Sequence, residues 1–185
     1  MGKPKLKIYP ALLVALGVIL LDQLTKILVR TFILEGTWIT LGKGLFGETF
    51  RLHHLKNEGA AFSLSLFGPA GDKIFFIATS LIAVVFIMWL LSNATHKVQR
   101  FALGLVLGGA IGNNLIDRPI FGAVTDFVDV NIPNIIPNMD RFPVFNVADS
   151  AIFIAMCLIL FDLFFLKEKK VLEQAPEPLP AENNS

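Results

Sequence analysis

LGGAIGNNLIDRPIFGAVTDFVDV, residues 107–130, is the stretch that decides the fold. It opens as a glycine-rich apolar run, becomes polar and charged over residues 113–118, and ends as an apolar segment that contains Asp126 and Asp129. Small residues let membrane helices approach closely, and Pro119 limits helical continuation through Arg118. The stretch therefore predicts a closely packed helix that ends at a polar boundary, with an extended segment after it.

The composition of the whole chain indicates a membrane setting. Of 185 residues, 54% are hydrophobic and only 17% are charged, which is far from the composition of a soluble domain. The net charge of +1 leaves no basic excess for phosphates, which argues against nucleic-acid binding. The one cysteine, Cys157, excludes an intramolecular disulfide and a cysteine-based zinc site, and is interpreted as a packing residue.

Four apolar segments predict a mainly α-helical membrane protein with four transmembrane helices. Each is about as long as the roughly 17–25 residues that cross a bilayer, the third a little short. They are residues 9–29, 74–91, 101–116 and 147–166. The first carries Asp22 and Lys26 and is too long for a cleaved secretion signal, so we interpret it as a retained span.

The distribution of lysine and arginine predicts the orientation, because cytoplasmic loops are enriched in these residues. They flank the ends that four spans would bring to one side: Lys3, Lys5, Lys7, Lys97, Arg100, Lys167, Lys169 and Lys170. Both termini are therefore expected in the cytoplasm. Residues 1–170 are expected to form one domain, and the Pro- and Glu-rich residues 171–185 a disordered cytoplasmic tail.

The first outer connector, about residues 37–67, predicts a small extracytoplasmic β-platform. TWITL and FRLHHL alternate apolar and polar residues, and glycines divide the connector into short pieces. His53 and His54 are adjacent, so in a strand they point to opposite faces and would not converge on one metal ion. No metal site is predicted.

Asp126 and Asp149 are the candidate catalytic pair. Asp126 follows the outer end of the third span and Asp149 lies near the outer end of the fourth. Two carboxylates that share a partly dehydrated site hold one proton between them, so one can accept a proton from water while the other donates to a carbonyl oxygen. The alternative is that Asn146 caps the fourth helix and Asp149 only stabilises its first turn.

Other polar residues at the outer boundary leave two interpretations open. Asp22 and Lys26, four residues apart, form either a structural ion pair or a substrate contact. Asn114, Asp117 and Arg118 either order a site or simply cap the third span. Asp129 is expected on the strand face opposite Asp126, as a bystander. Residues 131–141, NIPNIIPNMDR, are expected to form a turn-rich surface connector in which Asp140 and Arg141 are solvated, and Asp140 is also a bystander. Asp162 is expected to snorkel toward the cytoplasmic surface.

Taken together, these residues resemble the bacterial lipoprotein signal peptidases, also called signal peptidase II. The resemblance runs from Asp22 to Ser150. Its motifs are Asp22-Gln23-x-Thr25-Lys26, Asn57-x-Gly59-Ala60-Ala61-Phe62-Ser63, GGAIGNNLIDR (residues 108–118), Val124-x-Asp126-Phe127 and Phe142-Pro143-x-Phe145-Asn146-x-Ala148-Asp149-Ser150.

The resemblance implies an aspartic endopeptidase of the bacterial inner membrane, with Asp126 and Asp149 as its dyad near the outer leaflet. The implied substrate is a prolipoprotein whose cysteine carries diacylglycerol, cut just before that cysteine. No cofactor is implied, membrane lipid is an expected partner, and a monomer is expected. Substrate-binding or site-ordering roles are implied for Asn57, Asn114, Arg118, Asn146, Asp22 and Lys26.

One departure from the family pattern concerns the asparagines. The family has a single Asn after the glycine, three residues before the Asp, whereas this chain has Gly112-Asn113-Asn114. Counting back from Asp117 favours Asn114, and Asn113 stays open.

Two other classes of protein fit some of these features. A small proton-coupled transporter would use membrane carboxylates as a relay, but here both key aspartates lie near one interface and the middle of the spans lacks a polar path. A non-catalytic scaffold would use the same aspartates only as helix caps.

Overall fold

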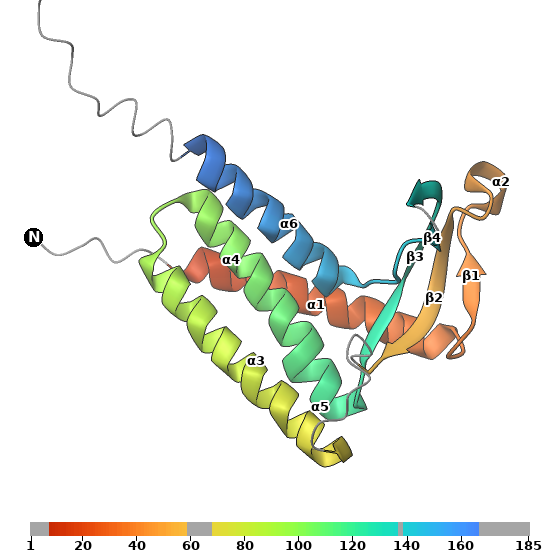
Figure 1. The fold of residues 1–185 in the computed structure, drawn as a ribbon, viewed down its shortest axis with the longest axis horizontal. Coiled ribbons are helices and arrows are strands. Elements are labelled where there is room, and N and C mark those ends of the chain that lie inside the picture. Colours follow the sequence, from red (N-terminus) through yellow and green to blue (C-terminus); the bar gives the residue numbers. More distant parts are fainter. Residues whose placement is uncertain (1–7, 59–67, 137–138, 167–185) are drawn as a thin grey trace, which may run out of the picture.

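Long helices and a small sheet divide the molecule into two parts in the computed structural model, which describes residues 8–58, 68–136 and 139–166 (Figure 1). The long helices are α1 (Tyr9–Phe32), α3 (Gly68–Asn93), α4 (Lys97–Ala110) and α6 (Val147–Phe161). They pack side by side, and the strands lie beyond one end of the bundle (Figure 1). Each of the four predicted apolar segments lies in one of these helices or its continuation.

Two π-helical segments and two short helices complete the helical part. Segment η2 (Ile111–Asp117) continues α4, and η3 (Asp162–Leu166) continues α6. The short helices are α2 (Lys43–Phe46), in the first outer connector, and α5 (Arg118–Phe121). Gly122, at φ +77°, ends α5 in the left-handed region that glycine adopts without strain.

The exposed surface of the helices is apolar. The windows within Tyr9–Phe32 and Val147–Phe164 are long and apolar enough to cross a membrane, yet only 22% and 17% of them is buried inside the protein. The core helix of a soluble protein would be mostly buried, so these two helices have the surface of lipid-facing spans. A shorter apolar helix covers Ile77–Asn93.

Small residues bring α4 against its neighbours. A Cβ added at Gly104 or Gly108 would lie within 2.7 Å of the carbonyl oxygen of Ala11 or Ala15 on α1. One added at Gly109 would lie 2.7 Å from the carbonyl oxygen of Ala148 on α6. The prediction that these glycines serve close helix packing is confirmed.

The sheet has the strand order β1-β2-β3-β4, with every neighbouring pair antiparallel. Its strands are β1 (Trp38–Thr40), β2 (Phe50–Asn57), β3 (Val124–Ile136) and β4 (Met139–Arg141). Two strands thus form in the first connector, as predicted, while residues 59–67 of that connector lie outside the described part. Phe127 of β3 packs on Val29 of α1 and on Ile33, the C-cap of α1, which fixes the sheet to the bundle.

One expectation about a connector is wrong. The Pro/Asn-rich residues 131–136 were expected in a turn-rich surface connector, but they continue β3. The ladder is irregular between Asn131 and Ile136, which is where a strand tolerates proline. Asp162 contacts the connector between α3 and α4, since its Oδ1 lies 2.9 Å from Nδ1 of His96.

Replacing Gly108 with alanine tests the close approach of α1 and α4. The new Cβ would lie 2.7 Å from the carbonyl oxygen of Ala15 and from Cβ of Val18, so the helices must separate, at a cost of about 1–3 kcal/mol. Thermal unfolding in detergent measures this loss. The matched control is Gly17→Ala in α1, where a Cβ meets nothing within 4 Å. Equal melting temperatures for the two variants would contradict the packing argument.

Candidate active site

A buried group of charges joins the helices to the sheet at the bundle end nearest the strands. Lys26 of α1 is fully buried, and its Nζ lies 2.7 Å from Oδ2 of Asp22 and 2.8 Å from Oδ2 of Asp117. Arg30 Nη1 lies 3.6 Å from Oδ1 of Asp117. Two carboxylates and two cations therefore balance, which is the condition for burying such charges. Of the two interpretations of Asp22 and Lys26, these contacts favour the structural ion pair.

Each buried carboxylate also holds one backbone amide next to a candidate catalytic residue. Oδ1 of Asp22 accepts the N–H of Ala148 at 3.0 Å, and Oδ2 of Asp117 accepts the N–H of Thr125 at 3.2 Å. Ala148 directly precedes Asp149, and Thr125 directly precedes Asp126. Lys26, which binds both carboxylates, thus connects the backbones that carry the two aspartates.

The π-helical turn separates the two adjacent asparagines. Asn113 points to the candidate dyad: its Oδ1 accepts from Lys26 Nζ at 2.6 Å, and its Nδ2 donates to Oδ1 of Asp149 at 2.8 Å. Asn114 instead accepts a 3.1 Å hydrogen bond from Nε of Arg118. A π-turn holds one more residue than an α-turn, so η2 accommodates the extra residue of this chain. The amide that contacts Asp149 of the candidate dyad is Asn113, whereas counting from Asp117 had favoured Asn114.

The orientation of the Asn113 amide follows from Lys26. An ammonium group has only donors, so the oxygen of Asn113 must face Lys26 and its NH₂ group must face Asp149. Gly112 lies beside this contact, and a Cβ there would be 2.8 Å from Oδ2 of Asp22. Only glycine lets the turn come this close to the buried carboxylate.

Asn146 caps α6 and contacts Asp126 at the same time. Its Oδ1 accepts the N–H of Asp149 at 2.9 Å, and its own N–H donates to Oδ2 of Asp149 at 3.1 Å, which forms a capping box. Its Nδ2 donates to Oδ1 of Asp126 at 2.7 Å. The predicted cap is therefore present, and it is also the connection between the two aspartates. The cap and the paired site were treated as alternatives, but one asparagine provides both.

Asp126 lies on β3 in a nearly dry environment, with 4% of its surface exposed. The β2–β3 register sets Asn57 opposite Val124, which lies on the same strand face as Asp126, two residues further on. From this position Asn57 donates to Oδ2 of Asp126 at 3.0 Å. Burial raises the pKa of Asp126 to about 6, and the negative charge of Asp149 adds to the rise. The hydrogen bonds from Asn57 and Asn146 and the charge of Lys26 oppose it.

Arg118 lies at the edge of this group. Besides Asn114, it contacts the backbone oxygen of Glu58 at 3.4 Å, and it interacts electrostatically with Asp126 and Asp117. The guanidinium of Arg118, which Asn114 contacts, thus lies within electrostatic reach of Asp126.

The remaining acids of this region behave differently from one another. Asp129 points away from Asp126 and is buried against Arg141, whose Nε lies 2.5 Å from Oδ1 of Asp129. Arg141 was expected to be solvated, and that expectation is wrong. Asp140 is exposed, as expected. His53 and His54 diverge as predicted: His53 Nδ1 lies 3.7 Å from Asp129, and Nδ1 of buried His54 lies 2.8 Å from the carbonyl oxygen of Ile33.

Sequence reasoning left Asn113 open as an alternative to Asn114 and gave no role to Gln23. Asp117 was interpreted as ordering the end of a span, but not as a ligand of Lys26. Gln23 Nε2 donates to Asp22 and Asp117 at 3.1 Å each. Within the part of the chain that the structure describes, no cluster of three His, Cys, Asp or Glu side chains could hold a metal ion.

Similar solved structures define the class of protein. One, described as a bacterial membrane enzyme, superposes with a TM-score of 0.74 at 28% identity and covers 89% of this chain and 99% of that chain. A second with the same description also gives 0.74, at 26% identity, and covers 96% of this chain and 100% of that chain. The fold, with its apolar helices and small sheet, is that of a bacterial membrane enzyme.

The family follows from the sequence. Residues 14–165 match the family model described as signal peptidase (SPase) II. A lipoprotein signal peptidase of Desulforapulum autotrophicum is 39% identical over 158 residues, which cover 84% of this chain and 91% of the relative. One from a Janthinobacterium species is 38% identical over 154 residues, with coverages of 83% and 87%. This chain belongs to the signal peptidase II family.

The raised pKa of Asp126 predicts a pH-dependent gain in stability for Asp126→Asn. Above pH 6 the wild-type protein buries a carboxylate that the unfolded chain would hydrate, so removing the charge should stabilise the fold by on the order of 1 kcal/mol. As the pH falls through about 6, wild-type Asp126 becomes neutral and the difference should shrink. Melting temperatures of both proteins between pH 4.5 and 8.5 measure this effect. A variant that is less stable than wild type at pH 8 would contradict the environment described for Asp126.

Proposed function

We propose that Asp126 and Asp149 form an aspartic-protease dyad that removes the signal peptide from a diacylglyceryl-modified prolipoprotein. The protein is a signal peptidase II protease that acts on lipoprotein signal peptides, as its family membership indicates. The assignment of the chemistry to these two aspartates is ours. The observation that carries it is that both carboxylates accept a hydrogen bond from one residue, Asn146. Asn146 and Asp126 are both buried.

We assign different roles to the two carboxylates. Asp149 is the third residue of α6, where the positive end of the helix dipole stabilises a negative charge. It also accepts from Asn113, whose orientation Lys26 fixes. These contacts favour an ionised Asp149. Asp126 lies on a strand without a helix dipole and is the more buried of the two, with 4% of its surface exposed, which favours it as the member that carries the shared proton.

The proposed reaction is direct hydrolysis by water. Asp149 accepts a proton from a water molecule as its oxygen attacks the scissile carbonyl carbon. Asp126 donates its proton to the carbonyl oxygen, which gives a tetrahedral intermediate without a covalent bond to the enzyme. Asp149 then transfers the proton it gained from water to the leaving nitrogen, while Asp126 takes a proton back from a hydroxyl group of the intermediate. The C–N bond breaks to give a carboxylic acid and a free amine, and both aspartates return to their starting protonation states. The bond cut is the one just before the lipidated cysteine.

The remaining site residues have positioning or substrate roles in this proposal. Asn57 and Asn146 orient Asp126, and Asn113 orients Asp149. Asn114 and Arg118 lie at the border of the site, where a guanidinium can bind a substrate carbonyl oxygen. Asp22 and Lys26 act on the framework rather than on the substrate.

The proposed setting is the bacterial inner membrane, crossed four times by α1, α3, α4 with η2, and α6 with η3. Residues 1–170 would form one domain with both termini in the cytoplasm, and residues 171–185 a cytoplasmic tail. Support comes from the lysine and arginine residues at one end of the predicted spans and from the apolar helix surfaces. The dyad, near the starts of β3 and α6, would then lie at the outer leaflet. We propose that the enzyme works as a monomer in contact with membrane lipid.

Substitution of either aspartate by asparagine tests the dyad. Asp126→Asn and Asp149→Asn should each lower cleavage of a purified lipidated precursor by about 10²–10⁴-fold or more, because each removes a proton-transfer group. Gel-shift assays with the reconstituted enzyme measure cleavage. Asp140→Asn, an exposed aspartate in the same connector, is the matched control and should retain activity. Wild-type cleavage by either dyad variant would exclude the proposed mechanism.

A further inference from the structure

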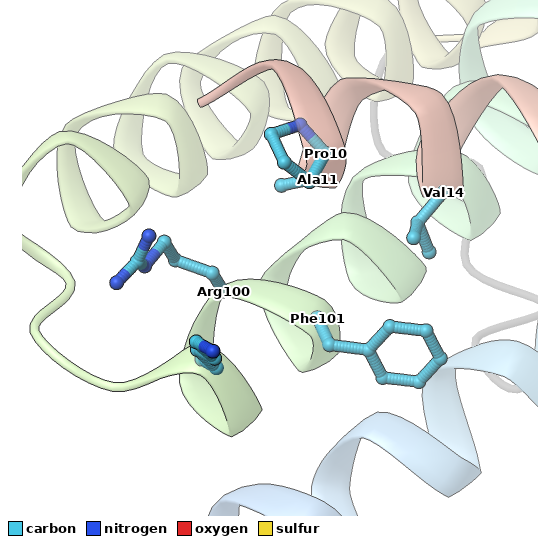
Figure 2. A pocket seen from close by; sticks show the side chains of 6 residues that line it. Pro10, Ala11, Val14, Arg100 and Phe101 are labelled. Atoms are coloured by element: carbon cyan, nitrogen blue, oxygen red, sulfur yellow. The ribbon is translucent and has the colours of Figure 1, made fainter. Parts of the chain in front are cut away.

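A groove lies between the first turns of α1 and α4, at the bundle end far from the dyad. Its volume is about 440 Å³, within the range of small-ligand sites. Figure 2 shows Pro10, Ala11 and Val14 of α1 across from Arg100 and Phe101 of α4. Lys97 is the sixth residue that lines it. The groove therefore combines apolar walls with two cations and has no acidic lining residue.

The two cations of the groove are available to a ligand. Nε of Arg100 is buried yet has no hydrogen-bond partner within the described part of the chain. Nη2 of the same side chain makes only a 3.4 Å contact, to the carbonyl oxygen of Thr95. Lys97 is exposed and makes no ion pair with any described residue. Arg100 is half-buried and lines the groove, so an anionic group in the groove would be attracted by its positive charge.

The backbone around the groove also contributes positive electrostatic potential. Pro10 and Ala11 belong to the first turn of α1, and Lys97 and Arg100 to the first turn of α4. Neither helix has a side-chain hydrogen bond at its N-cap, Ile8 or His96. Two uncapped helix N-termini add positive potential to the two side-chain charges. An acidic residue, Asp162, contacts the N-cap of α4: its Oδ1 lies 2.9 Å from Nδ1 of His96.

We infer that this groove binds one anionic phospholipid, with its phosphate at Lys97 and Arg100 and an acyl chain along Val14 and Phe101. The charge of the groove selects the headgroup, since basic pockets between membrane helices on the cytoplasmic side suit anionic lipids. The walls select a lipid rather than a free phosphate, because four of the six lining residues are apolar and one of them, Phe101, is 47% exposed. This site is separate from the proposed peptidase chemistry.

Lipid competition in native mass spectrometry tests the site. The full-length protein is mixed with equal amounts of phosphatidylglycerol and phosphatidylcholine that carry the same acyl chains. Each cation near an anionic headgroup contributes about fivefold to binding, so the wild type should retain one phosphatidylglycerol with at least about a tenfold preference. The double variant Lys97→Ala, Arg100→Ala should reduce the preference to less than about twofold.

Two further variants separate a bound lipid from a general attraction to positive charge. Lys43→Ala with Lys56→Ala removes the same charge from the sheet end and should leave the preference intact. Val14→Phe keeps both cations but fills the groove, and should lower the preference at least about threefold. The inference is wrong if the wild type shows no preference, if the control pair lowers it as much as the groove pair, or if Val14→Phe leaves it unchanged. A dimer that dissociates only in the groove variants would assign the groove to a second copy of the chain and also overturn the inference.

Discussion

The ammonium group of Lys26, held between Asp22 and Asp117, is the interaction on which the rest of the structure depends. All three side chains are fully buried. An uncompensated charge in such a place is strongly unfavourable, and breaking a buried pair typically costs about 3–5 kcal/mol. The cluster therefore specifies one arrangement of α1, η2, β3 and α6, because only that arrangement satisfies every charge. Since Asp22 and Asp117 also bind the amides that precede Asp149 and Asp126, the same arrangement fixes both proposed catalytic groups.

Close helix packing makes this cluster possible. Gly104 and Gly108 allow α4 to approach α1, and Gly109 allows it to approach α6. Gly112 continues that contact to the cluster itself, where any side chain would meet Asp22. The glycine-rich run and the polar residues after it thus act together. The glycines hold α4 close to α1 and α6, and the polar residues place paired charges between these closely packed elements.

Much of the fold could be predicted from the sequence, because its signals are local. Apolar length predicted the helices, alternation predicted strands in the first connector, and glycine spacing predicted the close packing of α4. The pairing of Asp126 with Asp149 had to be taken from a resemblance, since any two aspartates at the ends of apolar segments would look similar. The structure adds a physical link that local reasoning could not supply: Asn146 is both the cap of α6 and the partner of Asp126.

The failures have a common physical cause, which is long-range contact. The π-turn at residues 111–117 has no local sequence signature, so counting residues on an α-helix pointed to Asn114 and not to Asn113. Arg141 looked solvated because its partner Asp129 is twelve residues away on another strand. The length of β3 was missed because Pro133 and Pro137 are turn formers in isolation, whereas an irregular ladder accommodates the strand through Pro133.

The most direct test of this account is the turnover of Lys26→Met, measured well below its melting temperature in the same membrane mimetic as the wild type. Lys26 has no proposed contact with substrate, so the Michaelis constant for a lipidated precursor should change by less than about threefold. A displacement of about 1 Å in a catalytic group can lower a rate 10²-fold, so kcat should fall at least a hundredfold. A folded Lys26→Met enzyme with wild-type kcat would contradict the claim that this buried lysine positions the two proposed catalytic aspartates.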